Sequence, residues 1–166
     1  MKHNFKIGAN TFLLLALLVM LILFISSSMT YKQQTSVPFL EKYLRAEPFK
    51  NNLSGISFNY ATEKISIAKV GYFKFVEFFL RKSAHFFFYF LMGTFFYLGL
   101  KKRLKSIWLT IGIAFLSTVG YAALDEFHEM ITGGRTPLFQ DVMLDGVGAI
   151  VGILCIGLFF GKRLSS

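Results

Sequence analysis

Cysteine and charge are both scarce in this sequence. Of the 166 residues one is a cysteine, and Asp, Glu, Lys and Arg together make up 16%. Cys155 cannot form an intrachain disulfide; it lies in an apolar stretch, most simply as a small core residue, and says nothing about the redox compartment. So little charge beside 54% hydrophobic residues and a mean hydropathy of +0.55 argues against a soluble domain and is typical of a small polytopic membrane protein.

Internal repeats and low-complexity tracts are also absent, so the chain has room for a single domain, residues 1–166. Apolar stretches lie near residues 7–25, 84–100, 107–124 and 138–160, each close to the roughly 20 residues that a membrane-spanning helix needs. The third is expected to continue as a helix to residue 131. We therefore predict an all-α integral membrane bundle of four transmembrane helices.

The net charge of +9 would suggest a nucleic-acid partner for a soluble protein. Here the basic clusters flank the apolar stretches, where they meet anionic lipid headgroups, and no nucleic-acid-binding motif is recognisable. We expect the protein to contact membrane lipids and not nucleic acid. The sequence does not identify protein partners.

The distribution of Lys and Arg predicts the topology. Three segments hold eight basic residues and no acid: Lys2, Lys6, Lys101, Lys102, Arg103, Lys105, Lys162 and Arg163. The first loop, residues 28–80, is also basic, but long loops are weak topology signals. We predict both termini in the cytoplasm (N-in/C-in) and this long loop facing outward. The N-terminal stretch is expected to be an uncleaved anchor, because no A-x-A-like cleavage site follows it.

Local patterns add detail between the apolar stretches. Residues 56–60 and 65–67 alternate around a polar turn, which indicates a β-hairpin within the outward loop. Residues 72–80 form either an interfacial amphipathic helix or an extension of the second transmembrane helix. Gly133-Gly134 is expected to end the third helix, and Thr136-Pro137 to begin the fourth as its N-cap and first residue.

Charged residues at the ends of these apolar stretches are the most informative feature, because charge at membrane depth is costly and is usually paired or functional. Helical spacing groups them into stripes: Glu77, Arg81, Lys82, His85 and Tyr89 on the second helix; Tyr121, Asp125, His128 and Glu129 on the third; Asp141, Asp145, Gly148 and Gly152 on the fourth. The last two form a G-x-x-x-G pattern, which permits close helix approach. We expect the stripes to converge on one polar site near the outer surface.

These residues carry a family resemblance. The run from Phe78 to Phe86, with Tyr89, is similar to the first signature of the VanZ-like membrane protein family. The segments 125–129, 133–137 and 141–152 are similar to the second, so the resemblance covers residues 77–152. Stripes and signatures together give the candidate binding residues Arg81, Lys82, His85, Tyr89, Asp125, Glu126, Glu129, Arg135, Asp141 and Asp145.

The family is named for a protein that raises resistance to the glycopeptide teicoplanin. The resemblance implies a role in the bacterial cell envelope and a multi-pass location in the plasma membrane, and it implies no reaction. Two positions depart from the family pattern: Glu129 stands where Gln is common, and Asp145 where Asn is common. These two are therefore the weaker candidates for the central chemistry.

Four interpretations of the polar residues stay open. They could form a structural ion-pair network, although buried ion pairs stabilise poorly. They could bind an anionic headgroup, a lipid-linked envelope precursor or a glycopeptide's lipid-bearing part at the outer leaflet. They could act as an enzyme on such a precursor, with catalytic candidates His85, Asp125, Glu126 and His128. A metal site through Asp125-x-x-His128 is the least favoured, so we expect neither a metal nor a cofactor.

We favour a VanZ-like envelope protein that modulates sensitivity to glycopeptide and other surface-acting antibiotics through a polar site at the outer leaflet. A membrane enzyme and a structural network are the alternatives, and the sequence leaves enzymatic activity undecided.

Overall fold

A computed structural model describes residues 8–133 and 137–160, and helix dominates them. The elements in chain order are α1 (Ala9–Ser27), α2 (Tyr31–Gln34), α3 (Val37–Tyr43), α4 (Lys50–Leu53), β1 (Ser57–Tyr60), β2 (Glu63–Ser66), α5 (Ile67–Val70), α6 (Tyr72–Lys101), α7 (Ile107–Gly133) and α8 (Phe139–Phe160). Among the described residues, α1, α6, α7 and α8 are long and apolar enough to cross a membrane. The prediction of four such helices is confirmed.

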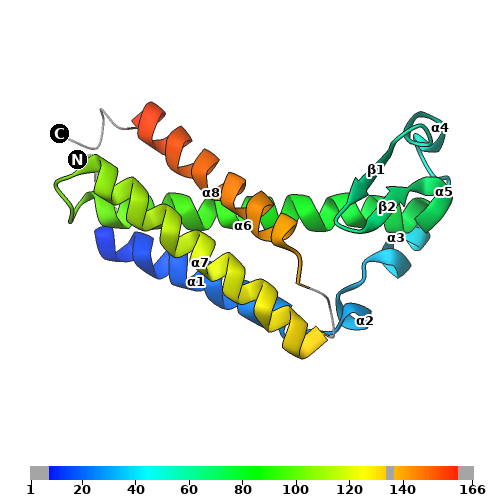
Figure 1. Cartoon of the computed structure of the whole chain (residues 1–166), viewed down its shortest axis with the longest axis horizontal. Coiled ribbons are helices and arrows are strands. Elements are labelled where there is room, and N and C mark those ends of the chain that lie inside the picture. Colours follow the sequence, from blue (N-terminus) through cyan, green and yellow to red (C-terminus); the bar gives the residue numbers. More distant parts are fainter. Residues whose placement is uncertain (1–7, 134–136, 161–166) are drawn as a thin grey trace, which may run out of the picture.

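Figure 1 shows the four long helices lying side by side, with α6 between the others. The helix α6 packs against α1, α7 and α8. The start of α1, the α6–α7 connection and the end of α8 all lie at the left-hand end of the view, opposite the short elements. An up-and-down arrangement of this kind places each polar stripe at a defined height in the bundle.

The helix α6 is longer than the apolar stretch that predicted it. Its 30 residues span about 45 Å at about 1.5 Å per residue, more than the roughly 30 Å of a bilayer core. Residues 72–80 are therefore a continuous extension of the helix, one of the two forms expected for them. Gly71 precedes the helix with φ 83°, a left-handed conformation that glycine adopts without strain, and so turns the chain from α5 into α6.

The segment before α6 is structured, and this corrects the expectation of an all-α protein with a long loop. It forms the short helices α2 to α5 and an antiparallel hairpin in which Tyr60 pairs with Glu63 and Ser57 with Ser66. The hairpin pattern in the sequence is confirmed. In Figure 1 the hairpin, α3, α4 and α5 gather around the end of α6 that extends past the bundle. We call α2 to α5 with the hairpin, residues 31–70, the outer module, because it lies beyond the end of the four-helix bundle.

Two hydrogen-bonded anchors hold the outer module on α6. The buried Glu77 carboxylate accepts hydrogen bonds from the Tyr31 hydroxyl (2.9 Å), the Thr35 hydroxyl (2.7 Å) and the Ser36 amide (2.6 Å). The Tyr72 hydroxyl donates to the Pro48 carbonyl at 2.9 Å. With the Ser36 hydroxyl at 3.3 Å as a fourth donor, the carboxylate is well satisfied, so Glu77 serves as a structural anchor.

Glycines let α6 and α8 approach closely. A Cβ on Gly152 would lie 2.3 Å from the Phe90 carbonyl oxygen, and one on Gly148 would lie 2.5 Å from the Phe86 carbonyl oxygen. On the facing helix, a Cβ on Gly93 would lie 2.8 Å from the Ala149 carbonyl oxygen. The close approach expected from G-x-x-x-G is therefore present, and it sets the distance between the two polar stripes.

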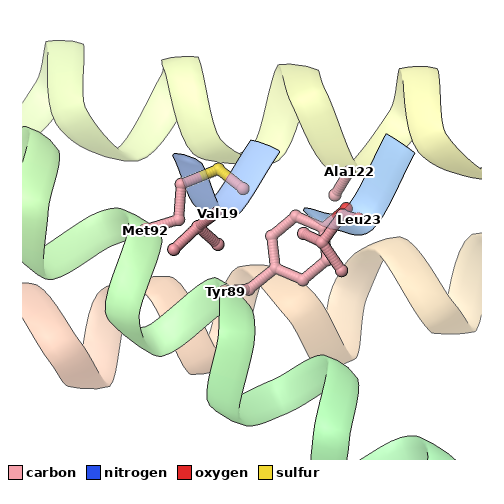
Figure 2. Packing of buried hydrophobic residues seen from close by; sticks show 5 residues of the cluster. All are labelled: Val19, Leu23, Tyr89, Met92 and Ala122. Atoms are coloured by element: carbon pink, nitrogen blue, oxygen red, sulfur yellow. The ribbon is translucent and has the colours of Figure 1, made fainter. Parts of the chain in front are cut away.

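Below the polar end, the bundle closes around a small apolar cluster. Figure 2 shows Val19 and Leu23 of α1, Tyr89 and Met92 of α6 and Ala122 of α7 pointing toward one another. Tyr89 is fully buried. This packing fixes the rotation of α6 about its axis. It thereby determines where the side chains point one turn closer to the outer module.

Candidate functional site

A cavity of about 400 Å³ lies where α6, α7 and α8 meet the hairpin. Its ionisable lining residues are Glu63, Arg81, Lys82, His85, Glu126, Glu129 and Asp141, and Tyr60, Ile65, Phe78 and Leu138 complete much of the wall. Unlike charges from three long helices thus surround one space at the end of the bundle that carries the outer module. Six of the ten candidate binding residues line it.

Asp141 is the residue on which α6, α8 and the hairpin meet. The Lys82 Nζ lies 2.5 Å from Asp141 Oδ1, and the two side chains are only 19% and 13% exposed. The Tyr60 hydroxyl donates a hydrogen bond to the same oxygen, and Lys82 Nζ lies 4.9 Å from the centre of the Tyr60 ring. One carboxylate therefore joins the hairpin to two helices.

Burial raises the pKa of Tyr60 above its ordinary value of 10.0, and the hydrogen bond to Asp141 and the negative charges around it raise that pKa further. The Tyr60 hydroxyl thus keeps its proton at physiological pH and remains a donor to Asp141.

His85 faces a carboxylate deeper in the bundle. Its Nδ1 lies 3.6 Å from Oδ2 of Asp145, which is 2% exposed, and the imidazole also lines the cavity. The distance is that of an ion pair rather than a hydrogen bond. This arrangement of a carboxylate behind a histidine can orient the ring toward a bound group.

Asp125 and Tyr89 form a buried pair below the cavity. The Tyr89 hydroxyl donates to Asp125 Oδ2 at 3.1 Å. Within the described part of the chain, Asp125 Oδ1 and Asp145 Oδ1 are buried without a hydrogen-bond partner. An unsatisfied buried acceptor costs about 1–3 kcal/mol, so these positions are not optimised for stability.

Glu126 and Glu129 complete the α7 side of the cavity. Glu126 Oε2 accepts a hydrogen bond from the Leu138 amide at 2.8 Å, which ties α7 to the segment that leads into α8. Glu129 is buried and lines the same space. This geometry is consistent with the helical spacing that groups Glu129 with Asp125. The structure adds Glu126 to the same part of α7.

His128 lies apart from this group, which corrects the stripe predicted for the third helix. Its Nε2 lies 3.0 Å from the Ser28 hydroxyl, and its ring lies 4.6 Å from that of Phe24. Tyr121 likewise turns toward α1, where its hydroxyl donates to the Met20 carbonyl at 2.6 Å. Tyr121, Asp125 and His128 do share a face of α7 and line one pocket, but this face packs toward α1, and from α7 only Glu126 and Glu129 line the polar cavity.

The remaining candidates divide as follows. Arg135, Gly134 and Thr136 lie outside the described residues. The helix α8 begins at Phe139 and not at Pro137, where the sequence predicted its first residue. Within the described ranges no three potential metal ligands gather, and His128, of the Asp125-x-x-His128 pair, turns toward α1.

Sequence reasoning missed Tyr60. It stands in a hairpin far from the signatures, and only the folding of the outer module onto α6 brings it to Asp141. The available signal was the hairpin itself, whose turn follows Tyr60 directly. The residues that face it, Lys82 and Asp141, were found because they lie beside the ends of apolar stretches.

Comparison with known proteins supports the resemblance. The family model described as VanZ/LLP1 matches residues 12–160, so the match extends well beyond the signatures at 77–152. No curated protein and no solved structure matches the chain. Together with the four apolar helices, the family match indicates a multi-pass membrane protein.

Proposed function

The chain belongs to the VanZ/LLP1 family, and we propose that its cavity binds the polar head of an envelope amphiphile at the outer leaflet of a bacterial plasma membrane. The amphiphile is a membrane lipid, a lipid-linked precursor or the lipid-bearing part of a glycopeptide. Its binding changes the sensitivity of the cell to glycopeptide and other surface-acting antibiotics.

The convergence of unlike charges on an open space carries this proposal. A network that only held helices together would bring its charged groups into contact and fill the volume between them. Here Lys82 and Asp141 pair, yet a cavity of about 400 Å³ remains beside them, room for many waters at about 30 Å³ each.

The proposed orientation puts the outer module and the cavity on the external face. The start of α1, the α6–α7 connection and the end of α8 share one end of the bundle, and that connection carries Lys101, Lys102, Arg103 and Lys105. A basic, acid-free segment of this kind favours the cytoplasmic side.

Lipid retention and antibiotic susceptibility test the proposal. We expect overexpression and deletion to shift susceptibility to at least one surface-acting antibiotic. We also expect mass spectrometry of gently purified protein to find a bound amphiphile. If neither susceptibility nor envelope lipid composition changes, the proposal fails.

A double variant separates binding from structure. Lys82→Gln with Asp141→Asn removes both charges at similar volume, so neither member of the pair is left as a lone buried charge. We expect normal abundance, lost amphiphile and lost antibiotic phenotype, with Lys105→Gln at the opposite end as the control. Normal abundance with full retention and phenotype would show that the pair serves only the packing.

The contact between His85 and Asp145 favours a second candidate, an enzyme acting on a lipid-linked precursor. There His85 would act as general acid or base and Asp145 would orient it. This candidate predicts a chemically altered envelope lipid that disappears with His85→Asn and persists with His128→Asn, because His128 lies away from the cavity. An unaltered lipid profile in the overexpressing strain would exclude it.

A further inference from the structure

A second cavity lies on the other side of α6. It measures about 380 Å³ and runs between α1, α6 and the start of the outer module. Its wall along the bundle is apolar, formed by Ile22, Leu23, Leu80, Ala84 and Phe88. Ile22 is 41% exposed and Leu80 51% exposed, so the surrounding medium reaches this wall. We call it the α1–α6 groove.

Arg81 stands at the polar end of the groove, which the Glu77 carboxylate one turn earlier on α6 also lines. The Arg81 guanidinium lies 5.1 Å from the centre of the Tyr31 ring. Among residues 8–133 and 137–160 no carboxylate oxygen lies within ion-pair distance of the guanidinium, so Arg81 interacts with Glu77 only through the field of its charge. The Glu77 carboxylate is itself held by four donor groups from the outer module.

A guanidinium without a direct ion pair, above an apolar wall, has a specific chemical complement. The guanidinium presents five N–H donors in a planar fork that fits two oxygens of a phosphate. The wall below it fits a hydrocarbon chain, since transfer of apolar surface out of water is favourable. Only an amphiphile whose anionic group adjoins its chain satisfies both at once.

We propose that the α1–α6 groove is a binding site for an anionic phospholipid of the bilayer, with its phosphate on Arg81 and one chain along Leu80, Ala84 and Phe88. Arg81 and His85 line the groove and the polar cavity alike. The group attached to the phosphate is thereby directed past α6 into the polar cavity. This inference rests on the function proposed for that cavity and names the class of amphiphile.

Native mass spectrometry of the purified full-length chain in detergent provides the test. The probes are dioleoyl phosphatidylglycerol, dioleoyl phosphatidylcholine and inorganic phosphate. We expect the anionic lipid to bind more tightly than the zwitterionic lipid. Arg81→Gln should weaken phosphatidylglycerol binding about tenfold to a hundredfold, the range for loss of charge-assisted hydrogen bonds. Lys105→Gln, which removes a charge at the far end, should leave it unchanged.

The groove itself is tested by filling it. Ala84→Trp places an indole against the apolar wall and should weaken phosphatidylglycerol binding about as much as Arg81→Gln. The matched control is Ala123→Trp, an exposed alanine on α7 outside both cavities. Ala84 is also exposed, so this variant carries the test if Arg81→Gln does not purify as a monodisperse protein.

Three results would overturn the inference. Unchanged phosphatidylglycerol affinity in Ala84→Trp would show that no chain lies in the groove. Equal affinity for the two lipids in the wild type would remove the anionic requirement. Full competition by inorganic phosphate would make Arg81 a site for the free ion. In each case the Lys82→Gln, Asp141→Asn double variant still decides the function of the polar cavity separately.

Discussion

Asp141 shows how a single side chain connects parts of the molecule that are distant in sequence. Its Oδ1 accepts hydrogen bonds from Lys82 of α6 and from Tyr60 of the hairpin. One carboxylate therefore shapes the part of the cavity wall where these elements meet. The Tyr60 hydroxyl adds a directional bond, while the Tyr60 ring adds a contact with Lys82 that does not need the hydroxyl. The two contributions can therefore be separated by experiment.

Tyr60→Phe removes the hydroxyl and keeps the ring. Because a typical hydrogen bond contributes about 1 kcal/mol, we expect amide hydrogen exchange in residues 57–66 to become about fivefold faster. Tyr43→Phe is the matched control, since Tyr43 is 63% exposed on the outer module. Equal exchange in wild type and Tyr60→Phe would show that the hairpin is held without Asp141.

The protonation of Tyr60 sets an alkaline limit to the same contact. Its folded-state pKa lies above the ordinary value of 10.0, so the stabilisation is fully present below pH 10 and is lost as the pH rises through the folded-state pKa. We expect the exchange difference between wild type and Tyr60→Phe to stay constant from about pH 6 to pH 9. A difference that vanished within this range would contradict the raised pKa.

At the scale of elements, the contact between α6 and α8 determines the width of the cavity. Gly148 and Gly152 allow the α8 backbone to reach the Phe86 and Phe90 carbonyls of α6. Lys82 and Asp141 form their pair at the end of this contact that is nearest the outer module, so any separation of the two helices would break the pair.

Gly152→Ala should force this separation. Its new Cβ would meet the Phe90 carbonyl oxygen at 2.3 Å, and overpacking of this kind costs about 1–3 kcal/mol. We expect a lower apparent melting temperature in detergent. Gly120→Ala on α7 is the control, because its Cβ meets nothing within 4 Å and alanine favours helix by up to about 1 kcal/mol. Equal melting temperatures of Gly152→Ala and Gly120→Ala would refute the close contact.

At the scale of the whole molecule, the outer module and the α6–α7 connection lie at opposite ends of the bundle (Figure 1). The proposed topology exposes the module outside the cell and the connection in the cytoplasm. Cys155 is the only native thiol in the chain, which makes cysteine labelling a direct measurement.

Single cysteines in a Cys155→Ala background should report the topology. An impermeant thiol reagent added to intact cells should label Asn52→Cys on the outer module and leave Lys105→Cys unlabelled until the cells are lysed. Both positions are exposed in the structure, so accessibility alone does not distinguish them. The reverse pattern would overturn the N-in/C-in orientation and place the cavity on the cytoplasmic face.

Part of the site could be predicted because helical spacing is regular. The residues Lys82, His85 and Asp141 stand at or near the ends of apolar stretches, and the structure brings them to one cavity. The placement of His128 was wrong because periodicity along α7 does not reveal which side α1 covers. Tyr60 could not be found because no periodic rule links a hairpin to a helix 81 residues later.

By itself, the amino-acid sequence determined that four helices form, where their apolar stretches lie and which of their residues carry charge. These properties are local: they depend on hydropathy and on spacing within a few turns. Tertiary structure alone decided that α6 extends into an outer module, that Tyr60 closes on Asp141, and that Arg81 and His85 stand between two cavities. These features depend on how helices pack and rotate against one another, and packing is settled by contacts between residues that are far apart in the chain.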